Sequence, residues 1–117
     1  MSTISHEDVG ADLRRIVIAG RLDTPGTNEI ASQLLELASA PKKGVVVNLS
    51  AVEFLTSIGI GHLILNARSV KNRGGRLVLV VGDSPTVMMS LKTTGIDQLI
   101  PVFQSAADAD RAALVEG

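Results

Sequence analysis

Short apolar runs alternate along the chain with longer segments whose apolar residues recur at helical spacing. Four apolar, largely β-branched runs have the pattern of strands: Leu13 to Ala19, Val45 to Leu49, Leu77 to Val81, and Leu99 to Val102. The second and third runs are continuous, which is typical of strands buried on both faces of a sheet. The segment around Thr3 to His6 is expected to pair with the first strand through a turn near Asp8 to Ala11. Pro101 places the last strand at a sheet edge or strand end.

Four helices are predicted between and after these strands. They cover Thr27 to about Ser39, Thr56-Ser57 to about Lys71, Ser84-Pro85 to Gly95, and a C-terminal segment that opens at Ser105. Strands that alternate with helices in this way form βαβ units. The sequence therefore predicts the α/β class, with a mixed, mostly parallel sheet of four to five strands covered by about four α-helices. An N-terminal hairpin adds the antiparallel pairing, and residues 1–117 form a single domain.

Composition removes several classes of function. The 117 residues include 11 Lys and Arg against 12 Asp and Glu, giving a net charge of −1, and they contain no Cys, Tyr or Trp and only two Phe. We therefore expect no nucleic-acid partner, no anionic membrane partner, no disulfide and no thiolate metal site. The polar opening segment lacks the features of a secretory signal and no apolar run is long enough to span a membrane, so a cytoplasmic location is expected.

Enzyme motifs are also missing. Gly59-Ile60-Gly61 lacks the rest of a dinucleotide-binding fingerprint, and there is no P-loop. The two histidines, His6 and His62, have no metal-ligand spacing with a nearby acid. Ser57 and His62 do not suit a nucleophile and base, because five residues apart on one helix they point about 140° apart. We expect no catalytic residues, no metal and no cofactor.

The segment from Asn48 to Gly61 carries the most information, because a buried strand leads there into a helix that opens with hydroxyls and glycines. Helical geometry predicts a buried side and an opposite, exposed side for this helix. The buried side is formed by Ile60, Leu63, Ile64, Ala67 and Val70, and the exposed side by Ile58, His62, Leu65 and Ser69. From geometry alone, the favoured interpretation of Ser57 is an N-cap that satisfies a free backbone amide. Ile58 and Leu65 can equally be scattered surface residues.

Several motifs in order resemble the bacterial anti-sigma factor antagonists, which are single-domain STAS proteins. They are Gly20-Arg21-Leu22-Asp23, the run Val46-Val47-Asn48-Leu49-Ser50 with Val52 and Phe54-Leu55-Thr56-Ser57-Ile58-Gly59-Ile60-Gly61, and Gly74-Gly75-Arg76-Leu77-Val78-Leu79. Ser84-Pro85 with Val87, and Thr94-Gly95-Ile96, extend the resemblance over nearly the whole chain. The resemblance implies a STAS-like fold, in which Phe54 is expected to pack in the core.

The resemblance also implies a partner switch. The unphosphorylated protein would bind an anti-sigma factor that is also a serine kinase, and would thereby release a sigma factor for transcription. Phosphorylation at the start of the second helix would break the complex, and a serine phosphatase would reset it. By motif position the phosphoacceptor is Ser57. The partner-binding residues implied are Asp23, Thr24, Thr56, Ser57, Ile58, Gly59, Gly61, His62 and Leu65.

Two departures from the family pattern keep alternatives open. Thr56 stands where the family usually has an acidic residue, which makes it a second candidate phosphoacceptor, and Ile58 replaces a small polar residue. Asp23 is either a turn residue before the first helix or the acidic residue that lies near the switch in the family. The alternative function is a non-switching STAS interaction module of a signalling or transport assembly. The free protein is expected to be a monomer or weak dimer.

Overall fold

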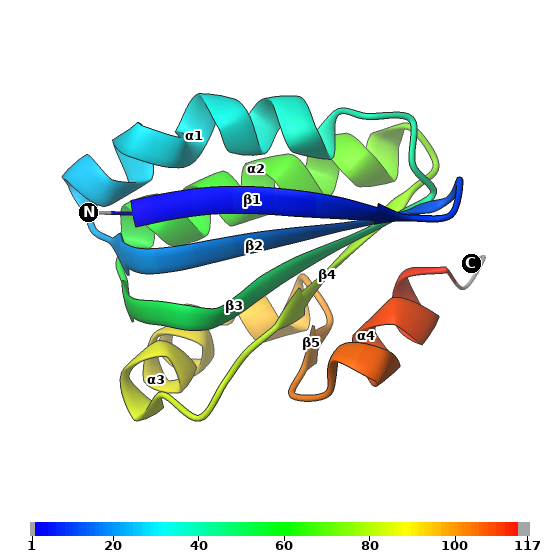
Figure 1. Cartoon of the computed structure of the whole chain (residues 1–117). Coiled ribbons are helices and arrows are strands. Elements are labelled where there is room, and N and C mark those ends of the chain that lie inside the picture. The colour runs from blue at the N-terminus through cyan, green and yellow to red at the C-terminus, as the bar shows by residue number, and fades with distance from the viewer. Residues whose placement is uncertain (1, 115–117) are drawn as a thin grey trace.

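The computed structural model describes residues 2–114, and these form a sheet with helices on both faces (Figure 1). The strands are β1 (Ser2–Val9), β2 (Leu13–Leu22), β3 (Gly44–Leu55), β4 (Arg76–Val80) and β5 (Val102–Phe103). The helices are α1 (Thr24–Ala38), α2 (Ser57–Asn72), α3 (Pro85–Thr94), the 3-10 helix η1 (Ile96–Gln98) and α4 (Ala106–Ala113).

The sheet has five strands in the order β1-β2-β3-β4-β5. β1 pairs with β2 antiparallel, and the other neighbouring pairs are parallel. In Figure 1, α1 and α2 lie above the sheet and α3 and α4 lie below it. The expected mixed, mostly parallel sheet with a hairpin at its start is confirmed.

Aliphatic side chains fill both layers. The larger core cluster joins the sheet to α1, α2 and α3, with Ile16, Val47 and Leu79 completely buried at its centre. A smaller cluster, which includes Val46 and Val78, holds α4 against the opposite face. Strands 45–49 and 77–81 were expected to be buried on both faces, and the alternate positions Val46 and Val47 do enter different clusters.

Several predicted boundaries differ from the structure. α1 begins at Thr24 rather than Thr27, because Asp23 caps the helix and Pro25 is tolerated in its first turn. The strand expected at Leu99 to Val102 is wrong, since the backbone amide of Ile100 donates to the Ile96 carbonyl (2.9 Å) and the strand covers only Val102–Phe103. Ile100 is apolar because it is buried in the core, not because it extends a sheet.

The largest difference concerns β3, which continues from Leu49 to Leu55. Its first part, Gly44 to Asn48, pairs with both β2 and β4, whereas the later residues pair with β2 alone, across two register shifts. Gly20, with a φ of 102°, lies in β2 at this irregular pairing, where the left-handed region favours glycine. The extension carries β3 as far as the end of β2, and this pairing builds the candidate site.

Candidate functional site

Two neighbouring parallel strands end side by side at the left-hand end of Figure 1. Leu22 closes β2, Leu55 closes β3, and these two residues are paired in register. Each strand leads within two residues into a helix, β2 through Asp23 into α1 and β3 through Thr56 into α2. The amino ends of α1 and α2 therefore lie next to each other, which we call the switch end of the molecule.

Asp23 is the N-cap of α1. One carboxylate oxygen accepts a hydrogen bond from the Gly26 amide (2.9 Å), and the other lies 3.5 Å from Nε of Arg21. The Gly26 amide first, and Arg21 second, hold the pKa of Asp23 below its usual value, so the group is a carboxylate at neutral pH. The turn interpretation of Asp23 is thus confirmed. Its contact with a partner stays a prediction, as does that of the exposed Thr24 beside it.

Arg21 is a residue of the switch end that sequence reasoning missed. Its guanidinium lies over the Phe54 ring, 4.7 Å from the ring centre, and Arg21 and Phe54 are paired across β2 and β3. Phe54 is half-buried beneath this cation, so its expected place in the core is corrected. Only the cross-strand register brings the two together, and no local sequence signal indicates it.

Thr56 is tied to the end of β2. Its hydroxyl donates to the Leu22 carbonyl oxygen (2.7 Å), and its backbone amide donates to the same oxygen (3.1 Å). The Thr56 side chain is half-buried by this contact. The second candidate phosphoacceptor is therefore already engaged in holding β2 and the start of α2 together.

Ser57 occupies the first position of α2, and its side chain is exposed. The expected capping role of Ser57 is wrong. The N-cap position belongs to Thr56, whose hydroxyl is turned toward Leu22 and makes no capping hydrogen bond. The Ser57 hydroxyl makes no hydrogen bond to any residue between 2 and 114, and the amino end of α2 has no side-chain cap. A free hydroxyl thus lies at the positive end of a helix dipole.

The two glycines of α2 differ in their surroundings. Gly59 is buried, and a Cβ atom there would lie 3.0 Å from Leu22 Cβ and 3.0 Å from a Leu55 methyl carbon. Gly59 therefore lets α2 pack closely on the two strand ends. Gly61 is exposed, and a Cβ atom there would meet nothing within 4 Å, so the fold itself does not require a glycine at that position.

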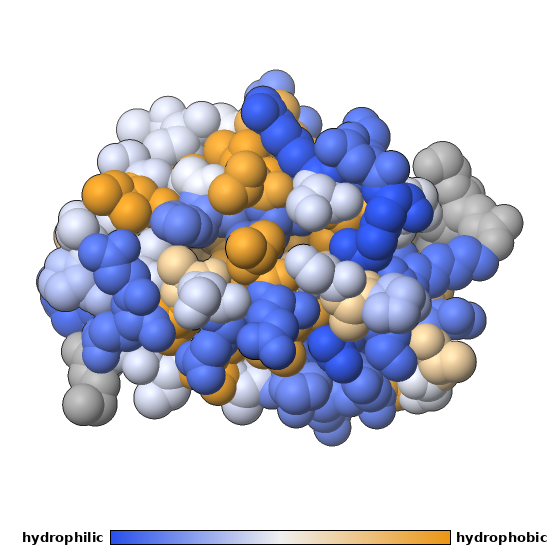
Figure 2. Space-filling model, turned by 90° about the horizontal axis from the view of Figure 1, so that it is seen from above, coloured by the Kyte–Doolittle hydropathy of each residue, from blue (hydrophilic) through white to orange (hydrophobic). Residues whose placement is uncertain are grey.

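An apolar stripe continues from Ser57 along the outer face of α2. Ile58 is 42% exposed and Leu65 is 57% exposed, with the half-buried His62 between them. We call Ile58, Gly61, His62 and Leu65 the α2 patch. Figure 2 shows hydrophobic surface in the upper half of the view, over α2. The expected exposure of Ile58, Leu65 and Ser69 is confirmed, whereas His62 is partly covered.

The inner side of α2 contains one residue that the helical pattern did not predict. Ile60, Leu63 and Val70 are buried as expected, but Asn66 is also buried, at 1% exposure. Its side-chain amide donates to the His62 carbonyl oxygen (2.8 Å), and its own carbonyl oxygen has no partner among the described residues. A polar residue at this position gives no apolar signal, so the pattern could not place it.

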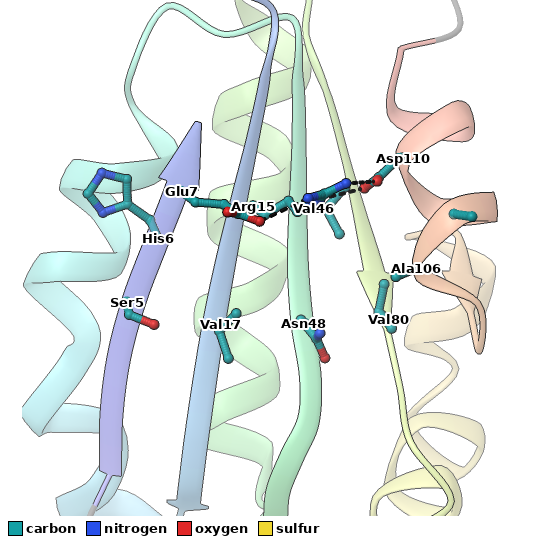
Figure 3. A pocket seen from close by; sticks show the side chains of 11 residues that line it. Ser5, His6, Glu7, Arg15, Val17, Val46, Asn48, Val80, Ala106 and Asp110 are labelled. Atoms are coloured by element: carbon teal, nitrogen blue, oxygen red, sulfur yellow. Dashed lines mark hydrogen bonds and ion pairs between the residues drawn. The ribbon is translucent and has the colours of Figure 1, made fainter. Parts of the chain in front are cut away.

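A separate cavity of about 570 Å³ opens on the opposite face of the sheet (Figure 3). Its apolar wall includes Val17, Val46 and Val80, and Arg15 bridges Glu7 of β1 and Asp110 of α4. None of the site residues expected from the sequence lines this cavity. No helix covers this face of β1 and β2 in Figure 1, an arrangement that becomes visible only once the layers are assembled.

The switch end lacks the groups of a catalytic centre. No base or carboxylate is hydrogen-bonded to Ser57 in the described part of the chain, whereas an activated nucleophile needs such a partner. Residues 2–114 contain no cluster of three or more His, Cys, Asp or Glu that could hold a metal ion. No helix within these residues is long and apolar enough to cross a membrane. What the site presents is an exposed hydroxyl beside an apolar helix face.

The five-stranded mixed sheet, with α2 opening directly after β3, agrees with what comparison with known proteins shows. The STAS domain family model matches residues 7–109, so the chain belongs to the STAS domain family. An anti-sigma factor antagonist from Mycobacterium paratuberculosis has a similar structure, with a TM-score of 0.87, 22% identity, and coverage of 97% of this chain and 94% of that one.

Two other solved structures are also similar to this chain. The Bacillus cell fate determinant SpoIIAA in its phosphorylated form has a TM-score of 0.67 and 20% identity, covering 94% of this chain and 99% of that one. A sulfate transporter family protein from Wolinella succinogenes has a TM-score of 0.69 and 18% identity, covering 92% and 88%. At these identities the likeness shows the fold alone.

Proposed function

We propose that this protein is an anti-sigma factor antagonist whose complex with an anti-sigma factor serine kinase is broken by phosphorylation of Ser57. The observation that carries the proposal is the exposed, unpartnered hydroxyl at the first position of α2, next to the α2 patch. A serine phosphatase would restore the binding form. On this proposal the protein acts in the cytoplasm, where it regulates sigma-factor-dependent transcription.

The surroundings of Ser57 favour it over Thr56 as the phosphoacceptor. A kinase needs a hydroxyl that can enter its active site, and the Thr56 hydroxyl is half-buried and donates to Leu22. Phosphorylating Thr56 would remove that hydrogen bond and place a dianion against a backbone carbonyl oxygen. Ser57 has no side-chain hydrogen bond to residues 2–114 that its modification would remove.

The charge of a phosphate has opposite effects on the fold and on the complex. A phosphoserine carries about −1.5 to −2 charges at neutral pH. At the uncapped amino end of α2 it stabilises the helix, an effect of about 0.3–1 kcal/mol. Inside an interface that covers the α2 patch, the same charge is desolvated and costs about 2–5 kcal/mol. Since about 1.4 kcal/mol is tenfold in affinity, this is enough to dissociate the complex while the fold remains intact.

Gly61 fits the same proposal. A glycine in a helix costs about 1 kcal/mol relative to alanine, and nothing in the described chain requires one at this exposed position. Close approach of a partner's backbone would explain it. Gly61→Ala is then expected to weaken partner binding although it stabilises the free protein.

The proposal is tested with a candidate anti-sigma factor kinase encoded beside this chain's gene. Incubation with the kinase and ATP should add one phosphate, seen by mass spectrometry and mapped to Ser57. Ser57→Ala should abolish the mass shift, and Thr56→Val should retain it. A shift that persists in Ser57→Ala, or a phosphate mapped to Thr56, would contradict the assignment.

A binding experiment separates the switch from the alternative function. Ser57→Asp should weaken binding to the kinase by at least about 30-fold, whereas the neutral Ser57→Asn, which has nearly the same shape, should weaken it far less. Both variants should melt within a few degrees of the wild type. Equal affinity of both variants would favour a non-switching STAS module of a signalling or transport assembly. This is the second candidate function, and the similar fold of a sulfate transporter family protein supports it.

A further inference from the structure

Two rows of side chains that cross the strands form the floor of the cavity on the α4 face of the sheet. The neutral row is paired in register from β1 through β4 and consists of Ser5, Val17, Asn48 and Val80. The charged row lies two residues away on each strand and consists of Glu7, Arg15 and Val46. Figure 3 shows both rows with α4 at the side of β4. Side chains two residues apart on a strand point to the same face, so the rows are continuous.

α4 covers only one side of this floor. Val46 and Val80 are buried in the cluster that holds α4, whereas Val17 is 38% exposed. The first turn of α4 contributes Ala106 and Ala107 to the lining, and these short side chains leave the space beside the floor open. The volume of about 570 Å³ falls within the range of pockets that bind small molecules, about 300–1,000 Å³.

The charges of the lining oppose an anionic ligand. Nε and Nη2 of Arg15 donate to Asp110, and Nη1 donates to Glu7 (2.8 Å). One guanidinium against two carboxylates gives these three groups a net charge of −1. An anion here would lie beside two carboxylates and would compete with them for Arg15. The ring of His6, the other titratable side chain of the lining, points away from the two rows in Figure 3.

The neutral row contains hydrogen-bond donors that the described chain does not use. The side-chain oxygen of Asn48 accepts from the Ser50 amide (2.9 Å) and from the Ser50 hydroxyl (2.6 Å). Because a backbone amide can only donate, the oxygen of Asn48 must face Ser50. Nδ2 of Asn48 then has no partner among residues 2–114, and neither has the Ser5 hydroxyl. The row therefore suits a ligand that brings a hydrogen-bond acceptor.

The length of the neutral row sets the size of this ligand. Its four members span three gaps between neighbouring strands, and each gap is about 4.8 Å, so the row is about 14 Å long. A bicyclic ring with one polar substituent fits within this length. Lying flat on the sheet, it would cover the exposed Val17 and remove apolar surface from water.

We propose that this cavity binds a flat, uncharged and largely apolar small molecule that carries a hydrogen-bond acceptor. Nδ2 of Asn48 donates to the acceptor, and the apolar body lies on Val17 beside the first turn of α4. The site is on the face of the sheet opposite α2, so the inference does not rest on the proposed partner switch. No cofactor was expected from the sequence, and the two rows exist only once the strands have paired.

The test is a titration of the full chain with two probes of nearly the same size and shape, followed by amide chemical shifts in NMR spectra. The probe 2-acetylnaphthalene is uncharged and offers a carbonyl acceptor, whereas 2-naphthoate carries a carboxylate in its place. The ketone should bind with a Kd below about 1 mM and shift the amides of Val17, Asn48 and Ala107. The carboxylate should bind about tenfold more weakly. No binding of the ketone, or equal binding of both probes, would overturn the proposal.

Two pairs of matched variants locate the site. Asn48→Asp keeps the oxygen that Ser50 uses but replaces the free donor by an acceptor, so it should weaken ketone binding about fivefold. Asn28→Asp makes the same change at an exposed position of α1 and should leave binding unchanged. Val17→Phe fills the cavity and should abolish binding. Val9→Phe should not, because Val9 is similarly exposed, at 41%, but lies outside the lining.

Other occupants give different results. Equal losses in Asn48→Asp and Asn28→Asp would show that the acceptor is not bound at Asn48. Shifts confined to Ile58 and Leu65 would place the probe on the α2 patch. A dimer in sedimentation velocity that Val17→Phe dissociates would make a second copy of this chain the occupant. Each of these results would overturn the proposal.

The variants are expected to fold, because the substituted side chains are at least partly exposed. Circular dichroism checks this for each of them. Phenylalanine is favoured in strands, which supports Val17→Phe. Should this variant fail to fold, Ala107→Leu fills the rim of the cavity from α4 instead, at an exposed position, and should weaken ketone binding. Unchanged binding in a folded cavity-filling variant would refute the site.

Discussion

Gly59 and Gly61 lie two residues apart in α2, and the same substitution at each is expected to change the stability of the fold in opposite directions. Gly61→Ala adds a Cβ atom that meets nothing within 4 Å. Gly59→Ala adds one that lies 3.0 Å from Leu22 Cβ, 3.0 Å from a Leu55 methyl carbon and 3.1 Å from the Leu22 carbonyl oxygen. Helix propensity favours both substitutions, whereas packing opposes only the second.

The magnitudes follow from these two contributions. Replacing a helical glycine by alanine raises the free energy of unfolding by about 0.5–1 kcal/mol when nothing else changes, which is the case for Gly61. At Gly59 an overpacked contact costs about 1–3 kcal/mol, and the three nearest atoms include one backbone atom, the Leu22 carbonyl oxygen, which has little freedom to move. Gly61→Ala should therefore raise the melting temperature by about 3–6 °C. At Gly59 the packing cost exceeds the helix gain by up to about 2.5 kcal/mol, so Gly59→Ala should lower the melting temperature.

Thermal and urea unfolding followed by circular dichroism measure both changes. A shift of the urea midpoint reports a change in stability when the slope of the transition equals that of the wild type. Each of the two variants is a control for the other, because both carry the same glycine-to-alanine change in the same helix. Stabilisation by both substitutions would mean that α2 does not approach the strand ends as closely as described. Destabilisation by both would mean that Gly61 has a neighbour, and the argument that a partner explains this glycine would fail.

Three further predictions concern contacts that link different elements. Thr56→Val removes the hydrogen bond that the Thr56 hydroxyl donates to the end of β2 and should lower the free energy of unfolding by about 1 kcal/mol in urea titrations. No loss would show that the hydrogen bond from the Thr56 backbone amide is enough to hold the end of β2. Arg14 holds the pKa of Asp8 at about 2. The stabilisation that comes from the Asp8–Arg14 ion pair is therefore present above about pH 4 and is lost as pH falls toward about 2. Asp8→Asn should flatten the acid dependence in that range, and an unchanged acid profile would contradict the ion pair. Arg15→Met breaks the link to Asp110 and should speed amide hydrogen exchange in α4 but not in α1; equal protection of α4 in both proteins would refute the link.

The fold was largely predictable because its elements carry local signals. Ser84 before Pro85, and the left-handed Gly95 after Thr94, mark the two ends of α3, and the structure places the helix between them. The errors in the predicted strands lie where burial or strand pairing overrides the local pattern of apolar and polar residues. Residues Ser50 to Leu55 contain polar positions that suggest a loop, yet pairing with β2 extends them as a strand, and Ile100 is apolar for burial without being in a strand.

The site was predictable in part, because motif position marks Ser57 but not its contacts. The expected N-cap at Ser57 failed because Ser57 is already the first residue of α2 and Thr56 occupies the N-cap position. The Thr56 hydroxyl in turn donates to the Leu22 carbonyl oxygen, which is 34 positions away in the chain. Arg21 over Phe54 and the buried Asn66 likewise depend on neighbours that only the assembled sheet and helices provide. Helical periodicity did predict the exposed face of α2, because exposure of a face follows from the spacing of its apolar residues alone.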